Sequence, residues 1–137
     1  MKSITVPAHD KNPDPINEFV EEQLARYDCP PKAMYQIQVA IEEILVNIVS
    51  YAQLAEDEHI EIRCEVLDEP LRVVLQFLDA GVPFDPLEKK DPDTSPEALM
   101  EREGGLGIFM VKQMMDEVSY AYEAGKNTLT IQKDLKA

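Results

Sequence analysis

Residues 38–52 read QVAIEEILVNIVSYA, and their apolar side chains recur with the period of an α-helix. Together with one residue just before it, this stretch predicts an apolar stripe of Ile37, Ile41, Ile44, Leu45, Ile48 and Ala52. Glu43 and Asn47 are one turn apart at the edge of that stripe, roughly 40° from each other around the helix axis. Glu and Asn side chains are usually exposed. The pair is therefore either an ordinary solvated helix edge or a polar site at the border of the core.

The composition indicates one acidic, globular α/β domain over residues 1–137. A chain of 137 residues can bury a core without disulfides or a structural metal. Its formal net charge is −14, which argues against a direct nucleic-acid partner or an anionic membrane. Either of these would require clustered Lys and Arg side chains. A basic protein surface would complement this charge better.

The two cysteines and the N-terminus bear on the compartment. Cys29 and Cys64 are isolated, without a CxxC motif or a nearby pair of histidines, and we interpret them as reduced thiols. No apolar segment near the N-terminus has the length of a signal peptide or of a membrane span. We therefore expect a cytoplasmic protein.

The rest of the chain alternates between strand and helix patterns. Apolar alternation predicts strands over residues 2–7, 59–67, 71–81, 118–124 and 128–135, the last two joined by a hairpin at 125–127. Helical periods predict helices over residues 16–27 and 108–116. The connection over 82–103 is rich in proline and acidic residues and long for a compact domain, which is typical of a functional lid or of disorder, and we expect a lid over 86–103.

Asp79 is the first residue outside the central stretch that packing alone does not explain. It has the same parity as Leu75 and Phe77, so it should leave its strand on the buried face. A buried carboxylate needs hydrogen-bond donors, and the amino group of an adenine is one such donor. Gly81 would let a flat ring approach the backbone. The alternative is an ordinary turn made by an Asp and a Gly.

The second such feature is the glycine-rich run Gly104-Gly105-Leu106-Gly107, which leads into a helix pattern. Successive backbone N–H groups at a helix N-terminus are suited to bind phosphate. The run is weak evidence by itself, and it matches neither a Walker A motif nor a Rossmann fingerprint. The sequence also has no HRD or DFG motif of the eukaryotic protein kinases.

Taken in order, three segments resemble a known set of motifs: EEILVN, DAGVPFDP and GGLGIFMVK. They are similar to the N, G1 and G2 boxes of the ATPase superfamily of gyrase, Hsp90, histidine kinases and MutL (GHKL). The fuller patterns DxGxPFDP and GGLGIFxVKxxMDEVxY resemble the anti-sigma factor serine/threonine kinases of that superfamily. The resemblance spans roughly residues 30–133. It implies a two-layer α/β sandwich of the Bergerat type, in which a mixed, mostly antiparallel sheet is covered on one face by three helices.

The resemblance also implies ATP and Mg²⁺ as cofactors and gives roles to particular residues. Glu43 would be the general base and Asn47 the Mg²⁺ ligand, roles that suit a carboxylate and a hard amide oxygen. Glu42, about 100° further around the helix, is the poorer candidate for the base. Asp79 would accept from the adenine amino group above Gly81. The backbone of Gly105, Leu106 and Gly107 would wrap the phosphates.

The chain departs from the family pattern at one position, and several further residues are candidates for contacts with the nucleotide. Tyr51 stands where many members have a histidine, four residues after the asparagine. Arg102 is the candidate for the γ-phosphate contact, with Lys112 as the other nearby cation. Thr128 or Thr130 on the last strand would help to hold the nucleotide.

The resemblance implies an enzyme, a Mg²⁺-ATP-dependent serine protein kinase. It would phosphorylate an anti-sigma antagonist protein, sequester a sigma factor and thereby regulate bacterial transcription; a homodimer is compatible with it. The alternative is a nucleotide-dependent protein-binding module with little or no kinase activity. A detached histidine-kinase ATPase domain is a weaker third reading, because His9 and His59 do not lie on a phospho-acceptor helix pattern.

Overall fold

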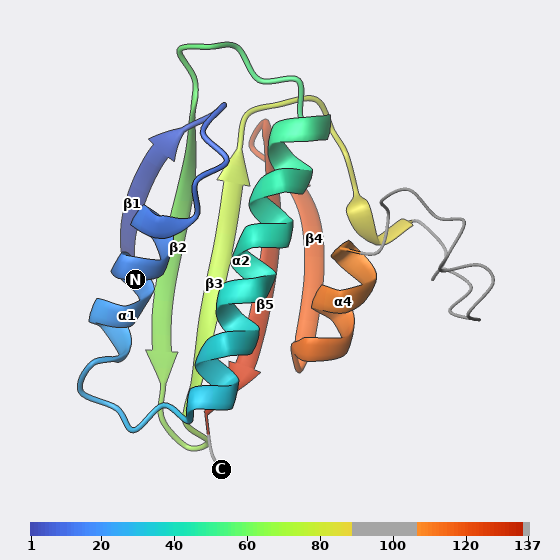
Figure 1. Ribbon diagram of the computed structural model, residues 1–137. Helices are drawn as coiled ribbons and strands as arrows, with labels where there is room; N and C mark the ends of the chain where they lie inside the picture. Colours follow the sequence, from blue (N-terminus) through green and yellow to red (C-terminus); the bar gives the residue numbers. More distant parts are fainter. Residues whose placement is uncertain (89–106, 136–137) are drawn as a thin grey trace, which may run out of the picture.

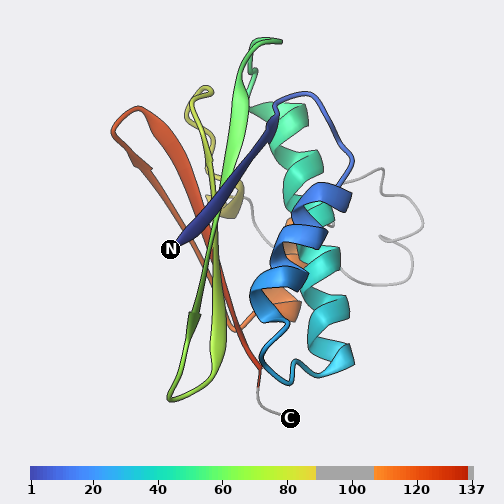
Figure 2. The same cartoon turned by 90° about the vertical axis from the view of Figure 1, so that its left-hand side faces the viewer.

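The structure, a computed structural model, describes residues 1–88 and 107–135. Within these ranges a five-stranded sheet forms one layer and three helices form the other (Figures 1 and 2). The strands are β1 (Lys2–Pro7), β2 (His59–Leu67), β3 (Arg72–Asp79), β4 (Glu117–Glu123) and β5 (Lys126–Asp134). The helices are α1 (Asp14–Leu24), α2 (Pro31–Tyr51) and α4 (Gly107–Met114), and a short 3-10 turn, η1 (Pro86–Glu88), follows β3.

Helix α2 is the centre of the helical layer and crosses the middle of the sheet (Figure 1). All six residues of the predicted stripe are buried: Ile37, Ile41, Ile44, Leu45, Ile48 and Ala52. The helix begins at Pro31, where a missing backbone N–H costs nothing because the first turn leaves its N–H groups unpaired in any case. The flanking helix α1 buries the four residues that its period predicts, Ile16, Phe19, Val20 and Leu24.

The sheet has the strand order β1-β2-β3-β5-β4. Side chains of one parity on each strand point to the helices, among them Ile60 and Ile62 of β2 and Leu75 and Phe77 of β3, all of which are buried. Charged residues of β2 such as Glu61 and Arg63 alternate with them and lie on the uncovered face. Figure 2 shows the helices gathered on one side of the sheet. The expected sandwich, with one solvated sheet face, is thus confirmed.

Three details differ from the sequence-based expectations or lie beyond them. Every strand pair among the described residues is antiparallel, so the expected mixed sheet is not found there. Helix α1 ends at Leu24, three residues before the predicted end at Tyr27. The expected lid over 86–103 begins with the turn η1, and the remainder of it falls outside the described residues.

The register of the sheet brings the end of β3 beside the start of β5. Asp79, the last residue of β3, pairs with Asn127, and Tyr120 of β4 pairs with Leu129. The C-terminal end of α2 lies at the same end of the sheet (Figure 1). This juxtaposition positions the candidate site.

Candidate functional site

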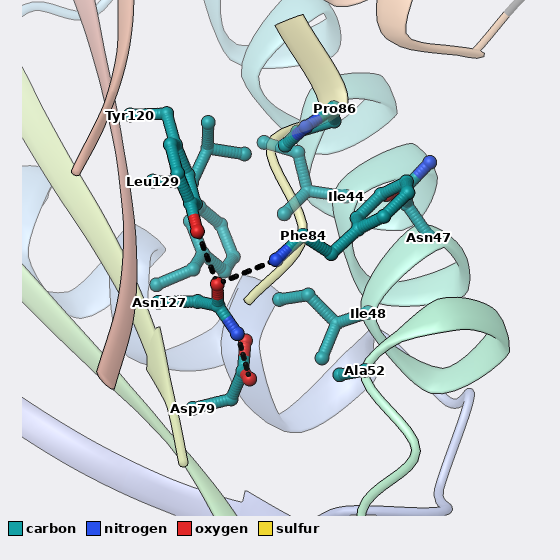
Figure 3. A pocket seen from close by; sticks show the side chains of 11 residues that line it. Ile44, Asn47, Ile48, Ala52, Asp79, Phe84, Pro86, Tyr120, Asn127 and Leu129 are labelled. Carbon is teal, nitrogen blue, oxygen red and sulfur yellow. Dashed lines mark hydrogen bonds between the residues drawn. The ribbon is translucent and has the colours of Figure 1, made fainter. Parts of the chain in front are cut away.

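A small cavity lies between the C-terminal half of α2 and the adjoining ends of β3 and β5 (Figure 3). The volume within which the centre of a water molecule fits is about 20 Å³. The cavity therefore has room for about one water. Its walls are mostly apolar, with a few polar groups that converge on one end. The lining residues are Ile44, Asn47, Ile48, Ala52, Phe77, Asp79, Phe84, Pro86, Tyr120, Asn127 and Leu129.

Asp79 is buried at the floor of this cavity, with only 4% of its surface exposed. The prediction that it leaves the sheet on the buried face is therefore confirmed. Its Oδ1 atom accepts hydrogen bonds from the side-chain amide of Asn127 (2.9 Å) and from the backbone N–H of Gly81 (3.0 Å). Burial raises the pKa of the Asp79 carboxyl, against the lowering effect of these two hydrogen bonds, and the charge of Glu58 raises it further.

Asn127 connects the polar groups at one end of the cavity through its hydrogen bonds. The sequence analysis did not identify this residue. It is 5% exposed. Its Nδ2 donates to Asp79 Oδ1 and to the carbonyl of Val82 (2.8 Å). Its Oδ1 accepts from the backbone N–H of Phe84 (3.0 Å) and from the hydroxyl of Tyr120 (Figure 3).

The parity of β5 was the signal that could have identified Asn127. It has the same parity as Leu129 and Ile131, which face the helices. By the same count Thr128 and Thr130 lie on the uncovered face of the sheet, where Thr130 accepts a hydrogen bond from Gln76 (3.3 Å). The expectation that one of these threonines helps to hold a nucleotide is therefore wrong, because the sheet lies between them and the cavity.

Asn47 and Glu43 lie on the α2 side of the site, as the helix period predicts. Asn47 is half-buried and lines the cavity opposite the strand ends (Figure 3). Glu43, one turn earlier, is half-buried and rests against Gly107, the first residue of α4. Glu42 is exposed. Of the two adjacent glutamates, Glu43 is therefore the one held at an interface.

Two glycines have a steric reason to lack a side chain. A Cβ atom on Gly81 would come within 3.0 Å of the backbone oxygen and the Cβ of Ala52, at the end of α2. The N–H of Val82 also donates to that oxygen (2.9 Å), so this loop is fastened to the helix end. A Cβ atom on Gly107 would meet Oε2 of Glu43 in the same way. The close contact with α2 thus explains why residue 81 is a glycine. The expectation that an adenine ring lies above Gly81 stays a prediction.

An aromatic pair closes the cavity on the outer side. The ring of Phe84 stacks on the ring of Tyr51, with centroids 5.0 Å apart and planes 17° from parallel. Phe84 lines the cavity, whereas Tyr51 is at the end of α2 and is 45% exposed. Tyr51 therefore supports one wall of the pocket through Phe84.

The structure does not place the remaining predicted site residues at the cavity. Arg102, Gly105 and Leu106 lie outside the described residues. Lys112 is in the last turn of α4, away from the helix N-terminus. Within residues 1–88 and 107–135 no three His, Cys, Asp or Glu side chains are grouped to hold a metal ion. No helix in those ranges combines the length and the apolarity needed to span a membrane.

Comparison with known proteins assigns the chain to a class. Residues 6–133 match the family model described as "Histidine kinase-like ATPase domain". The chain therefore belongs to the histidine kinase-like ATPase domain family.

Among the similar proteins of this class are serine-protein kinases named RsbW. The one from Listeria monocytogenes is 32% identical over 99 residues, which cover 69% of this chain and 62% of the relative. The one from Staphylococcus aureus is 32% identical over 107 residues, covering 72% and 64%. The chain thus matches somewhat less than two thirds of the length of these relatives. They confirm the predicted resemblance to the kinase branch of the superfamily.

Solved structures agree on the fold. The RsbU and RsbW domains of Rv1364c from Mycobacterium tuberculosis superpose with a TM-score of 0.65 at 16% identity, over 98% of this chain and 33% of that one. The histidine kinase AdeS of Acinetobacter baumannii gives a TM-score of 0.53 at 15% identity, over 100% of this chain and 69% of that one.

Proposed function

We propose that this protein is a Mg²⁺-ATP-dependent serine protein kinase that acts on a small antagonist protein and also sequesters a sigma factor. The observation that carries the proposal is Asp79, a buried carboxylate at the floor of a mostly apolar cavity within a histidine kinase-like ATPase domain. The names of the RsbW relatives support serine as the acceptor.

The chemistry of the cavity fits an adenine base. Both hydrogen bonds to Asp79 from the described residues reach Oδ1, which leaves Oδ2 to accept from an exocyclic amino group. Ile44, Ile48 and Leu129 supply apolar walls for a flat ring. The present cavity is too small for a base, so binding would require lining residues such as Phe84 and Pro86 to move outward.

Asn47 is suited to hold Mg²⁺, because its amide oxygen is a hard ligand placed at the cavity wall. When bound, Mg²⁺-ATP supplies the phosphoryl group and the cation that offsets its charge. The N-terminus of α4 at Gly107 would receive phosphate oxygens, with Gly105, Leu106 and Arg102 as further candidates. Mg²⁺ in nucleotide sites commonly has one or two protein ligands, and phosphate oxygens and waters supply the others.

Glu43 would act as the general base. Its carboxylate lies at the N-terminus of α4, where it could take the proton of a serine hydroxyl as that oxygen becomes a nucleophile. The present contact with Gly107 also favours a second candidate function. If the Glu43 carboxylate stayed against Gly107 when nucleotide is bound, it could not act as the base. The protein would then be a nucleotide-dependent protein-binding module without phosphoryl transfer.

The acidic surface suits protein partners with basic faces. The net charge of −14 would steer such a partner toward the chain. An anti-sigma antagonist and a sigma factor are the partners that the family suggests, in the cytoplasm, with a homodimer as a compatible assembly.

A phosphoryl-transfer time course with labelled Mg²⁺-ATP and candidate antagonist proteins from the same genome tests this proposal. Glu43→Ala should bind ATP like the parent but transfer roughly 10²-fold more slowly, the scale of general-base loss. Asn47→Ala should instead weaken ATP binding and its dependence on magnesium. Glu42→Ala is the matched control and should transfer like the parent. If the parent binds ATP and antagonist without transfer, the binding module is correct and the kinase is not.

A further inference from the structure

The side-chain amide of Asn127 uses its entire hydrogen-bonding capacity. An amide has two N–H donors and two acceptor sites on its oxygen. Asn127 donates to Asp79 and Val82 and accepts from Phe84 and Tyr120. The amide cannot be reversed, because a carbonyl oxygen can only accept a hydrogen bond and a backbone N–H can only donate one.

This fixed orientation dictates what Asp79 can offer to a ligand. Oδ1 already accepts from Asn127 Nδ2 (2.9 Å) and from the N–H of Gly81 (3.0 Å), so it carries no proton. Oδ2 is the oxygen left for a ligand. In the ionised carboxylate Oδ2 is purely an acceptor, and it therefore favours a ligand with an N–H donor over one with a carbonyl at the same place.

Asn127 also fastens the loop that forms the outer wall of the cavity. Its bonds to the Val82 carbonyl (2.8 Å) and to the Phe84 N–H (3.0 Å) hold both sides of Pro83 against the start of β5. The same side chain thus orients the carboxylate on the floor and the loop on the wall. Figure 3 shows it between Asp79, Tyr120 and the backbone of Phe84.

We propose that Asn127 is a positioning residue that sets base specificity, by presenting Asp79 to the pocket as an acceptor that selects a base with an exocyclic amino group. This inference rests on the proposed nucleotide-binding function. A purely structural role for Asn127 would affect all nucleotides alike. The proposed role affects the discrimination between adenine and hypoxanthine, which carries a carbonyl oxygen in place of the amino group.

The test is a calorimetric titration of Mg²⁺-ADP and Mg²⁺-IDP into the parent and into Asn127→Asp. The substitution keeps the size of the side chain but places two carboxylates at hydrogen-bond distance, so that they hold one proton between them. When Asp79 carries that proton on Oδ2, it donates to a carbonyl oxygen instead of accepting from an amino group. The parent should prefer ADP by about tenfold or more. In Asn127→Asp the ADP affinity should fall and the ratio of ADP to IDP affinity should approach one.

Three further variants make the result specific. Gln76→Glu adds a carboxylate to the uncovered face of β3 and should keep the parental ratio. Tyr120→Phe removes one donor to Asn127 but leaves the N–H of Phe84 to fix the amide, so it should lower the ratio of ADP to IDP affinity less than Asn127→Asp does. Asn127→Ala removes a hydrogen bond that lowers the pKa of Asp79 and holds its Oδ1, so the carboxyl takes up a proton more readily and can donate to a carbonyl. This variant should also lower the ratio, and it carries the test if Asn127→Asp does not fold.

Two outcomes overturn different claims. If the parent binds ADP selectively and the Asn127 variants are equally selective, Asn127 does not set specificity, and the proposed function is unaffected. If the parent binds neither nucleotide, the proposed function itself fails and this inference fails with it.

Discussion

The carboxylate of Glu43 lies against the backbone of Gly107, in the space that the Cβ atom of any other residue would need. This contact joins the polar edge of α2 to the first residue of α4. Because a helix N-terminus carries a partial positive charge, a carboxylate there is favourably placed. A phosphate group would be attracted to the same position, so the fold brings the candidate base to the candidate phosphate site.

Gly107→Ala should separate activity from stability. The new methyl group would meet the far end of a flexible side chain, which can move aside. Alanine is also a better helix former than glycine, so the free energy of unfolding should change by less than about 1 kcal/mol. Displacement of Glu43 should slow phosphoryl transfer by about tenfold or more. Thermal denaturation and a transfer assay measure the two effects; parental transfer would contradict the role of this contact.

Gly81→Ala is the matched comparison for that variant. Here the methyl group would meet the backbone oxygen of Ala52, which is held at the end of α2 and cannot move without the helix. We expect a loss of about 1–3 kcal/mol of stability, the usual cost of overpacking. Equal melting temperatures for the two alanine variants would contradict this description of the two glycines.

Asp79→Asn should stabilise the protein at neutral pH. Burial raises the pKa of Asp79, so ionisation of this carboxyl costs the folded state free energy. That cost is absent below the ordinary carboxyl pKa of 3.8 and is complete once the pH exceeds the raised value. The variant should therefore melt above the parent at pH 7, and the gap should close as the pH falls toward 3.8. Paired melting curves across this range measure it; a gap that is constant with pH would contradict the assignment.

The sequence predicted the elements whose signals are local and periodic. The stripe from Ile37 to Ala52 is buried because an amphipathic helix has only one face to bury, and this face meets the middle of the sheet. The position of Asp79 followed in the same way from the alternation along β3. Both predictions needed only the period of one element.

Asn127 escaped prediction because it depends on where a turn ends. The sequence suggested a turn over residues 125–127, typical of Gly and Asn. In the structure the turn is made by Ala124 and Gly125, with φ of 53° and 77°, and Glu123 pairs with Lys126. Two positive φ values form a tight two-residue loop, so β5 begins early and Asn127 belongs to it. The hydrogen bonds that Asn127 makes to β3 and β4 are tertiary contacts, and no local sequence pattern predicts them.

Tyr51→Ala should speed nucleotide entry. Tyr51 does not line the cavity, but its ring stacks on Phe84, which does. Such a stack is worth about 0.5–1.5 kcal/mol, so its loss should raise the association rate by roughly two- to tenfold if opening limits entry. Stopped-flow mixing with a fluorescent ADP analogue measures this rate. Tyr35→Ala, at a 64% exposed position elsewhere on α2, is the control. Equal association rates for the two variants and the parent would show that the stack does not gate the pocket.

The most direct test of this account is a calorimetric titration of Mg²⁺-ADP into the parent and into Asp79→Asn. Asparagine can still accept from Asn127 and Gly81 through its oxygen, but it presents an N–H group to the cavity where the parent has Oδ2. The account predicts that the parent binds ADP and that the variant, although more stable at pH 7, loses about 1.5–3 kcal/mol of binding free energy, about tenfold or more in affinity. Equal ADP affinity for the two proteins would contradict the assignment of this cavity as the nucleotide site.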